Sequence, residues 1–374
     1  MGIKSIEIEN FKSIKNSGVI ELKDINVLVG ANGSGKSNFI EFFNFLKIIA
    51  DEKLHLYLNT NTTKDKDGID NILHFGRKKS KCLSGKISFY KDDIEDGYIF
   101  SLVINNDNRF VFNREEGFCN KIDFSNTYLI DEQIGSKLET SLRIKLDSQD
   151  KRNRYILTYI DLCKIYHFND TSMTSNIKTP SKIYKEQLFS EEISLEEDGR
   201  NIALFLYNFS KKYPEEFKAL EQTIKSVVPF FDKFYLVTDI KTDEIYLRWI
   251  EDDTIFPASS LSDGTLRFIC LASILIHPIK PMTIILDEPE LGLHPFAIEE
   301  LASLIHIASE ECQIILSTQS IDLIAQFSAD DIIVVNRKNN ETFFKRQNEE
   351  DLKEWLEDYS IGEIWNKNVI GGNP

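Results

Sequence analysis

The pattern of apolar and polar positions indicates that the two ends of the chain form one unit and that the middle is an insertion. Residues 3–10 alternate and residues 19–29 run apolar, as strands do, and residues 37–50 follow with the apolar face of a helix. From residue 282 onward, apolar strand patterns alternate with helical ones. Alternating β and α elements are typical of a mostly parallel sheet with helices on its faces. The two ends therefore predict one α/β unit.

The middle of the chain has a different character. Over residues 51–200, Asn, Asp and Lys are frequent, and short strand candidates are separated by turn residues. Residues 201–228 then have a helical pattern, and residues 234–240 with 244–250 predict a hairpin. We therefore expect a discontinuous head, and no heptad pattern is sustained enough to predict a long coiled-coil arm. The expected boundaries are residues 1–50 and 229–374 for the head, and residues 51–228 for an inserted lobe that is first β-rich and then helical.

The charge of the chain narrows the choice of partners. The 374 residues include 60 acidic and 44 basic side chains, which gives a formal net charge of −16. Non-specific binding of nucleic acid needs Lys and Arg facing phosphates, so bulk electrostatics do not favour it here. Nucleic acid remains a candidate partner through local basic clusters, namely residues 77–81, 151–154 and 211–212, or through another protein.

The apolar runs and the cysteines of the sequence bear on the cellular compartment and on metal binding. No apolar signal-peptide core follows Met1, and the longest apolar run, residues 268–276, is well short of the ~20 residues of a membrane helix. Five cysteines at irregular spacing form no metal-binding motif. We expect a cytoplasmic protein without a membrane partner.

A phosphate-binding loop is the first chemical motif. Residues 30–37 match G-x-x-x-x-G-K-[ST] in full, and they lie between an apolar strand and a helix, as the mechanism requires. Its glycines let successive N–H groups point at phosphate oxygens, Lys36 should reach the β- and γ-phosphates, and the Ser37 hydroxyl should bind Mg²⁺. The alternative is a glycine-rich turn without a ligand. The candidate ATP-binding residues are Asn32, Gly33, Ser34, Gly35, Lys36, Ser37 and Asn38.

A second motif stands at the end of an apolar strand. Residues 283–286 are all apolar or Thr and lead into Asp287 and Glu288. Such a strand is buried on both faces, and its carboxyl end is where ligands bind in open α/β folds. Asp287 is then a candidate to share Mg²⁺ with Ser37, and Glu288 is a candidate base or water-positioning group. The alternative is a strand that ends in solvent with acids.

A third motif precedes an apolar helix. Residues 259–265 contain Ser262, Asp263 and Gly264, and they resemble the signature loop of ABC-type ATPases, whose usual form is Leu-Ser-Gly-Gly-Gln. Ser262 offers a hydroxyl at a helix start and Gly264 permits close approach of phosphate. In isolation the same pattern is only a helix N-cap.

The resemblance extends over both ends of the chain to the RecF/SMC-type ATPases. It is carried by residues 6–13, SDGTLR at 262–267, LDEPE at 286–290, LHP at 293–295 and LSTQS at 316–320. The tail, residues 355–372, is similar to small stand-alone bacterial and archaeal AAA-family ATPases, relatives of the ATPase part of OLD-family proteins. The resemblance implies an α/β P-loop NTPase of the ABC-ATPase head type. Such a head has a mixed, mainly parallel sheet with flanking helices, an N-terminal antiparallel β region and a helical or irregular insertion.

The resemblance also implies a homodimer that closes on ATP, with Ser262 and Gly264 acting on the partner subunit's nucleotide. It assigns catalysis to Lys36, Glu288 and Gln319. At the position of Gln319, ABC heads usually carry a histidine. Glutamine can still hydrogen-bond a γ-phosphate or the attacking water, but it cannot become cationic. Hydrolysis is therefore expected to be slow or regulated by a partner. ABC heads also carry a glutamine in a segment called the Q-loop. No residue of this chain is assigned to that role, and residues 71–76 are only a suggestive segment for it.

Two hypotheses on the biological role remain open. The first is an ATPase that controls an effector supplied in trans, a nuclease or toxin, in DNA repair or anti-phage defence. Its motivation is that residues 347–374, with seven acids against two bases, are too few for a nuclease domain. The second is an ATP-gated switch or scaffold with negligible hydrolysis that binds a protein partner, motivated by Gln319. Transport is less favoured, because no membrane segment is predicted.

Overall fold

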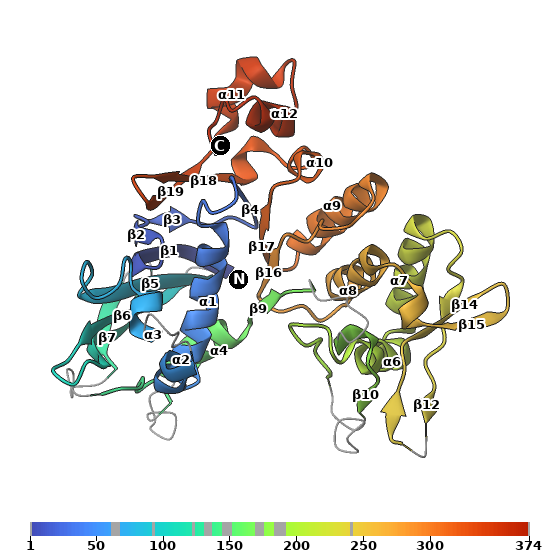
Figure 1. The fold of residues 1–374 in the computed structure, drawn as a ribbon, viewed down its shortest axis with the longest axis horizontal. Helices are drawn as coiled ribbons and strands as arrows, with labels where there is room; N and C mark the ends of the chain where they lie inside the picture. Colours follow the sequence, from blue (N-terminus) through green and yellow to red (C-terminus); the bar gives the residue numbers. More distant parts are fainter. Residues whose placement is uncertain are drawn as a thin grey trace.

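The structure is a computed structural model, and it describes residues 2–60, 68–91, 94–121, 124–130, 137–143, 152–168, 176–182, 192–239 and 242–372. The centre of the molecule is a six-stranded sheet that collects strands from both ends of the chain (Figure 1). Its strands, in spatial order, are β19 (Glu341–Arg346), β18 (Ile332–Lys338), β4 (Ile25–Val29), β17 (Gln313–Thr318), β16 (Thr283–Asp287) and β9 (Cys163–Tyr166). All neighbouring strands pair in parallel except β19, which is antiparallel to β18. This confirms the predicted α/β head fold.

The central sheet is buried on both faces. Along β4, Val27 and Val29 pack into one apolar cluster and Leu28 packs into the other. The same alternation runs through β16, β17 and β18. Because neither face meets water, these strands read as continuous apolar runs. One face is covered by α8 (Asp263–Ile276) and α9 (Pro295–Ser309), with α6 (Ile202–Lys212) and α7 (Pro214–Val227) outside them.

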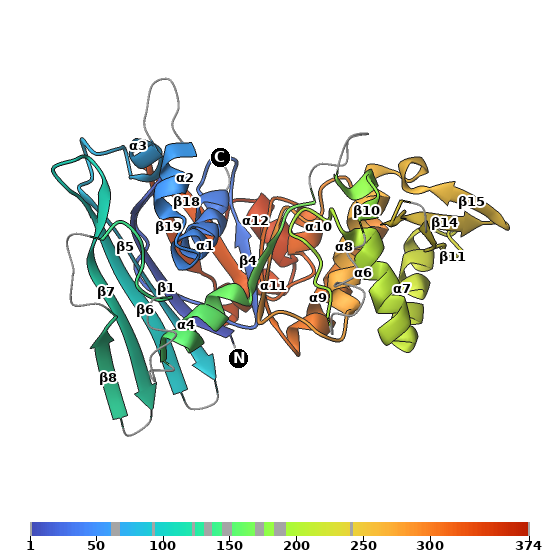
Figure 2. The same cartoon turned by 90° about the horizontal axis from the view of Figure 1, so that it is seen from below.

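The opposite face is covered by α1 (Lys36–Ala50) and a second, antiparallel sheet. Phenylalanines of α1 join these two layers: the rings of Phe42 and Phe11 lie 5.3 Å apart, and those of Phe42 and Phe100 lie 6.2 Å apart. The strands in spatial order are β2 (Ile14–Asn16), β1 (Gly2–Phe11), β5 (Cys82–Lys91), β6 (Ile94–Ile104), β7 (Phe110–Lys121) and β8 (Phe124–Leu129), and β3 (Ile20–Glu21) also pairs with β1. Figures 1 and 2 place this sheet at one end of the molecule and α6 and α7 at the other.

The segment predicted as an insertion contributes to both sheets. Strands β5 to β8 extend the sheet that begins with β1, and β9 forms the edge of the central sheet next to β16. The division at residues 51 and 229 stays a prediction, but β9 belongs to the same sheet as the phosphate-loop strand. Where the structure describes this part, it also contains the helices α2 (Leu54–Thr60), α3 (Gly68–Ile72) and α4 (Arg152–Asp161).

Small elements complete the chain. The predicted hairpin over 234–240 and 244–250 is present in short form, since β12 (Thr238–Asp239) pairs antiparallel with β13 (Glu244–Ile245). The other short strands are β10 (Ser181–Lys182), β11 (Lys233–Phe234), β14 (Arg248–Glu251) and β15 (Thr254–Pro257), and the C-terminal helices are α10 (Ile321–Ile324), α11 (Glu349–Leu356) and α12 (Ile361–Asn366). Within the described residues, no helix combines the length and apolarity that crossing a membrane requires.

Candidate active site

The parallel order of β4, β17 and β16 brings the three predicted catalytic segments together. Val29 is in register with Thr318, and Ser317 is in register with Asp287. The carboxyl ends of adjacent parallel strands meet at one edge of a sheet, which is where open α/β folds bind ligands. The phosphate loop, Asp287–Glu288 and Gln319 therefore share this edge.

The phosphate loop has the backbone that its glycines predict. Gly33 and Gly35 have φ values of +76° and +117°, which side chains rarely tolerate. A Cβ on Gly35 would lie 2.3 Å from Thr342 Oγ1. Gly35 is also the N-cap of α1, and no side chain caps this helix. The N–H groups of its first turn therefore face the site as an anion-binding group.

Lys36 is held inside the loop. Its residue is only 5% exposed, and its ammonium donates to the carbonyl oxygens of Gly30 and Ala31. Burial lowers the pKa of Lys36, and the nearby carboxylates of Glu288 and Asp287 oppose that change. A buried ammonium with neutral carbonyl partners and acidic neighbours fits a site in which phosphate oxygens are to be bound.

Ser37 and Asp287 meet at a cavity of about 590 Å³. Ser37 and Asp287 both line it, and Asp287 Oδ1 accepts a hydrogen bond from the Ser317 hydroxyl. These are the oxygen ligands that Mg²⁺ prefers, and Mg²⁺ commonly takes one or two protein ligands together with substrate phosphates. The residues present therefore fit the ion that the sequence predicts.

Gln319 connects Glu288 to the phosphate loop. Its side-chain amide donates to Glu288 Oε1 at 2.6 Å and to Asn32 Oδ1 at 2.8 Å. Glu288 itself has φ +48°, the left-handed region that few non-glycine residues adopt, and its N–H donates to the Ser317 carbonyl at 3.0 Å. Such backbone strain is typical of functional sites. The Glu288 carboxylate thus lies directly after the end of β16, in hydrogen-bond contact with Gln319.

Glu290 is a site residue to which the sequence assigned no role. Its Oε1 accepts from the Thr318 hydroxyl and from the Gln319 N–H at 3.3 Å, while its Oε2 is buried without a hydrogen-bond partner. Burial raises the pKa of this carboxyl. The motif at 286–290 included Glu290, but the sequence does not reveal its burial.

The remaining loop residues are supported from outside the motif. Asn38 donates to Ser13 Oγ at 2.6 Å, so in this structure it contacts the turn after β1. Ser13 Oγ lies 2.7 Å from Thr342 Oγ1, and that hydroxyl donates to the Ser34 carbonyl at 2.8 Å. The Ser34 hydroxyl is buried with no partner. Sequence reasoning missed Thr342 as a support of the loop, because no local pattern identifies it.

The signature loop is at a different place in the same chain. Ser262 caps α8 by accepting from the Thr265 N–H at 3.1 Å and is exposed, and a Cβ on Gly264 would lie 2.2 Å from the Gly292 carbonyl oxygen. Asp263 forms an ion pair with Lys178 at 3.1 Å. Helices α8 and α1 lie on opposite faces of the central sheet (Figures 1 and 2). The contacts of the signature loop are thus with the segment after Glu288, on the other side from α1.

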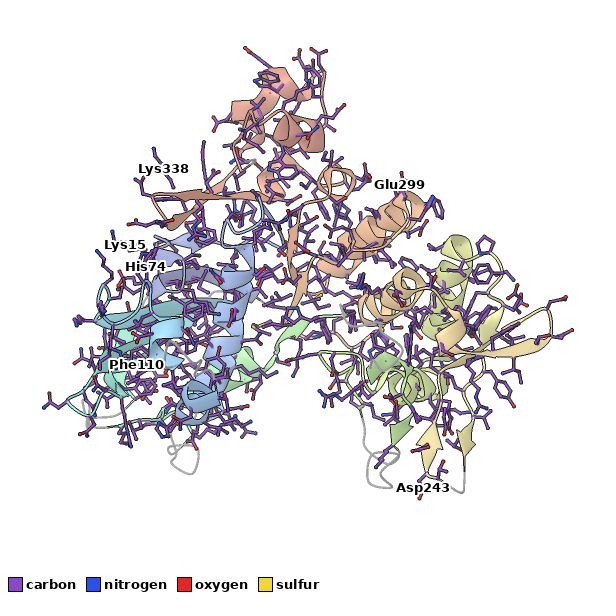
Figure 3. The ribbon with its side chains drawn as sticks, viewed as in Figure 1. Lys15, His74, Phe110, Asp243, Glu299 and Lys338 are labelled. Atoms are coloured by element: carbon purple, nitrogen blue, oxygen red, sulfur yellow. The ribbon has the colours of Figure 1, made fainter. Side chains whose placement is uncertain are left out.

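Two histidines differ from the prediction: one lies away from the site, and the other lines its cavity. His74, from the suggestive segment 71–76, packs its ring nitrogen 2.8 Å from the Lys12 carbonyl, beside β1 (Figure 3). Instead it is His167, which follows β9, that lines the cavity with Ser37 and Asp287. Sequence reasoning missed His167, because β9 is short and was not assigned to the central sheet.

One basic side chain in each of two clusters has a partner in the chain itself. Arg77 pairs with Asp70 at 3.1 Å, and the Lys211 ammonium lies 5.5 Å from the centre of the Tyr207 ring. Lys151 of the second cluster lies outside the described residues.

The chain has the fold and the sequence motifs of an AAA-type ATPase. The family model described as "AAA domain, putative AbiEii toxin, Type IV TA system" matches residues 25–325, and the chain belongs to this family. Membership implies nucleotide binding and confirms the predicted relationship to AAA-family ATPases.

Individual relatives are distant. The chain is 22% identical over 305 residues to a Helicobacter pylori protein named "ATP/GTP phosphatase", covering 78% of this chain and 77% of that protein. It is 26% identical over 208 residues to "Urease accessory protein 2" of Cryptococcus neoformans, covering 54% of this chain; the match spans 15% of that protein's length.

Solved structures show the same fold. An SMC head bound to the C-terminal winged-helix domain of ScpA superposes with a TM-score of 0.56 at 17% identity, covering 94% of this chain and 99% of that one. An SMC head with an extended coiled coil, bound to a ScpA C-terminal domain derived from Pyrococcus furiosus, has the same TM-score and identity and covers 96% and 99%.

Proposed function

We propose that this protein hydrolyses ATP to ADP and phosphate at the carboxyl edge of its central sheet. The observation that carries the proposal is the convergence of Lys36, Asp287, Glu288 and Gln319 at this edge, beside an uncapped helix N-terminus. Phosphoryl transfer is catalysed mainly by positioning and electrostatic stabilisation, and this set of groups offers both.

Each residue has a role that its geometry supports. The N–H groups of the loop and the Lys36 ammonium bind phosphate oxygens, for which Lys36 leaves the carbonyls of Gly30 and Ala31. Glu288 accepts a proton from the attacking water, and Gln319 holds the Glu288 carboxylate in place. Ser37 and Asp287 would hold Mg²⁺, which when bound neutralises charge on the phosphate oxygens.

The proposal includes a homodimer formed through the ATP sites. Ser262 is exposed at the start of α8, on the sheet face opposite α1, where a second chain can reach it. The signature loop of each subunit then completes the nucleotide site of the other. This arrangement accounts for a signature loop that, within one chain, contacts Gly292 and Lys178.

We further propose that the dimer controls an effector supplied in trans, a nuclease or toxin, in the cytoplasm. The similarity to SMC heads that are bound to domains of ScpA supports a protein partner. Pairing of Arg77 with Asp70 makes that one basic side chain less suited to phosphate, while Lys78, Lys79 and Lys81 stay exposed.

A second candidate function is an ATP-gated switch with negligible hydrolysis. It is favoured by the bond between Gln319 and Glu288, because that bond occupies a carboxylate oxygen that would otherwise accept a hydrogen bond from the attacking water. Under this alternative, ATP binding alone closes the dimer and presents a surface to a protein partner.

Steady-state phosphate release and light scattering separate the two. For an ATPase, Glu288→Gln should lower turnover by about 10²-fold or more and trap an ATP-bound dimer. Glu299→Gln, a change at an exposed position of α9 (Figure 3), is the matched control and should behave as wild type. Wild-type turnover that is measurable and equal in Glu288→Gln would refute the assigned role of Glu288. ATP-dependent dimerisation of wild type without phosphate release would instead support the switch.

A further inference from the structure

Two glycines from the far end of the chain lie against the phosphate loop. The Ala31 N–H donates to the Gly372 carbonyl at 2.6 Å. The Gly372 N–H in turn donates to Asn336 Oδ1 at 2.7 Å, and Asn336 belongs to β18, the strand beside the phosphate-loop strand. Ala31 is thus tied to the central sheet through Gly372 as well as through its own strand.

The backbone conformation and the close packing at these two positions favour glycine over any other residue. Gly371 and Gly372 have φ values of +81° and +86°. A Cβ on Gly372 would lie 2.9 Å from Val334 Cγ1 and 3.1 Å from Trp365 Nε1, and it would face Gly30 Cα at 3.5 Å. A Cβ on Gly371 would lie 3.1 Å from Asn336 Nδ2. A side chain at residue 372 would therefore push the segment away from the loop.

The peptide groups held by Gly372 are those that hold Lys36. The carbonyls of Gly30 and Ala31 accept from the Lys36 ammonium, and Gly30 has no room on its other side, since a Cβ there would lie 2.3 Å from the Val335 carbonyl oxygen. Gly30 is therefore enclosed between β18 and Gly372. Fixing this turn fixes the place from which Lys36 moves to phosphate oxygens.

The same C-terminal segment also reaches the other half of the site. Gly362 of α12 packs so closely on α10 that a Cβ there would lie 2.4 Å from the Ile321 carbonyl oxygen. Helix α10 begins at Ile321, and its N-cap is Ser320, the residue after Gln319. One segment thus contacts both the loop that binds phosphates and the segment that carries Gln319.

We propose that Gly371, Gly372 and Asn336 are positioning residues for nucleotide binding: they form a strap that holds the Gly30–Ala31 turn and so presets Lys36 for the phosphates of ATP. The proposal rests on the ATP site described above. A preset turn lowers the cost of ordering the loop on binding, so the strap acts on nucleotide affinity more than on the chemical step.

The test compares Gly372→Ala with Gly18→Ala. Gly18 has φ +62° and open space around its Cβ position, so it reproduces the backbone strain without touching the loop. Asn336→Leu is the second variant, because it removes the acceptor of the Gly372 N–H while leaving both glycines. For each, the Kd of a fluorescent ATP analogue, KM and kcat for ATP, and the melting temperature without nucleotide are measured.

The strap predicts that Gly372→Ala and Asn336→Leu raise Kd and KM by about 10-fold, with kcat within about twofold of wild type. Gly18→Ala should leave Kd, KM and kcat unchanged. Unaltered Kd in Asn336→Leu and in folded Gly372→Ala would overturn the strap, as would a fall in kcat at unchanged KM. If wild type binds ATP but releases no phosphate, the ATPase proposal fails while the Kd comparison still decides on the strap.

Discussion

The side-chain amide of Gln319 bridges Glu288 and Asn32, with donor–acceptor distances of 2.6 and 2.8 Å. A residue from the end of β17 thereby ties the proposed base at the end of β16 to the phosphate loop after β4. Gln319, at the position that resembles the switch histidine of ABC heads, thus already hydrogen-bonds the proposed base and the phosphate loop.

Replacing Gln319 by Glu should impair turnover more than replacing it by His. A carboxylate at this position would face Glu288 and Asn32 Oδ1 with acceptors only, and two carboxylates at such a distance repel each other. We expect Gln319→Glu to lower kcat by about 10²-fold, and Gln319→His, which keeps a donor, to stay within about 10-fold of wild type. Steady-state phosphate release measures both, and equal rates in the two variants would contradict the bridging role.

Lys36→Met should stabilise the nucleotide-free protein while removing ATP binding. Burial lowers the pKa of Lys36, so between that pKa and its ordinary value the folded chain binds fewer protons than the unfolded chain. The free energy of unfolding therefore rises with pH through that alkaline window, and below it the buried charge costs stability. We expect the variant to gain about 1 kcal/mol at pH 7.

Thermal melts with and without Mg-ATP check this prediction. Wild type should melt higher with nucleotide, and Lys36→Met should not respond. Lys338→Met, at an exposed position near the end of β18 (Figure 3), is the control and should respond as wild type does. A lower melting temperature for nucleotide-free Lys36→Met than for wild type would argue against the buried-charge explanation.

Glu290→Gln should be stabilising in a pH-dependent way. Burial raises the pKa of Glu290 above its unfolded value, so this group contributes stability at acid pH that is lost as pH rises through the folded pKa. At pH 7 the amide removes a buried charge and keeps an acceptor for Thr318. We expect the variant to be more stable by about 1 kcal/mol at pH 7, with the difference shrinking toward pH 4. Urea unfolding at both pH values measures it, and a constant difference would point to another cause.

Gly264→Ala should loosen the contact between the signature helix and the loop after Glu288. The added Cβ would lie 2.2 Å from the Gly292 carbonyl oxygen, a backbone atom that cannot rotate away. We expect a loss of about 1–3 kcal/mol in stability and a weaker ATP-dependent dimer in the Glu288→Gln background. ATP binding by the monomer should persist, because α8 and α1 lie on opposite faces of the sheet. A variant that dimerises as well as its parent would show that Gly264 is not needed at the interface.

The parts of the fold and site that the sequence predicts are those with local signals. The phosphate loop combines spacing, glycines and strand–helix context within residues 27–50, and the strand ending at Asp287 is apolar throughout, so both could be placed without a structure. Strand β9 has only four residues and begins two positions after α4 ends, and only its pairing with β16 makes it part of the central sheet. A prediction from local pattern cannot supply such a pairing.

The supports of the site escaped prediction for the same reason. Thr342 contacts the Ser34 carbonyl, and Gly372 contacts Ala31, through bonds between residues more than three hundred positions apart. Glu290 was visible in a motif, but its buried, partnerless oxygen depends on how Thr318 and the central sheet enclose it. These properties arise from tertiary packing, which no short window of sequence contains.

The pairing of β4 also determines when this protein can fold during synthesis. Both neighbours of β4, β17 and β18, come from the last quarter of the chain, with Ile25 in register with Ile314. On the ribosome, the apolar strand of the phosphate loop thus waits unpaired while most of the chain is made. Such distant pairings fold slowly, so the apolar strand β4 is exposed to aggregation until β17 and β18 have been synthesised.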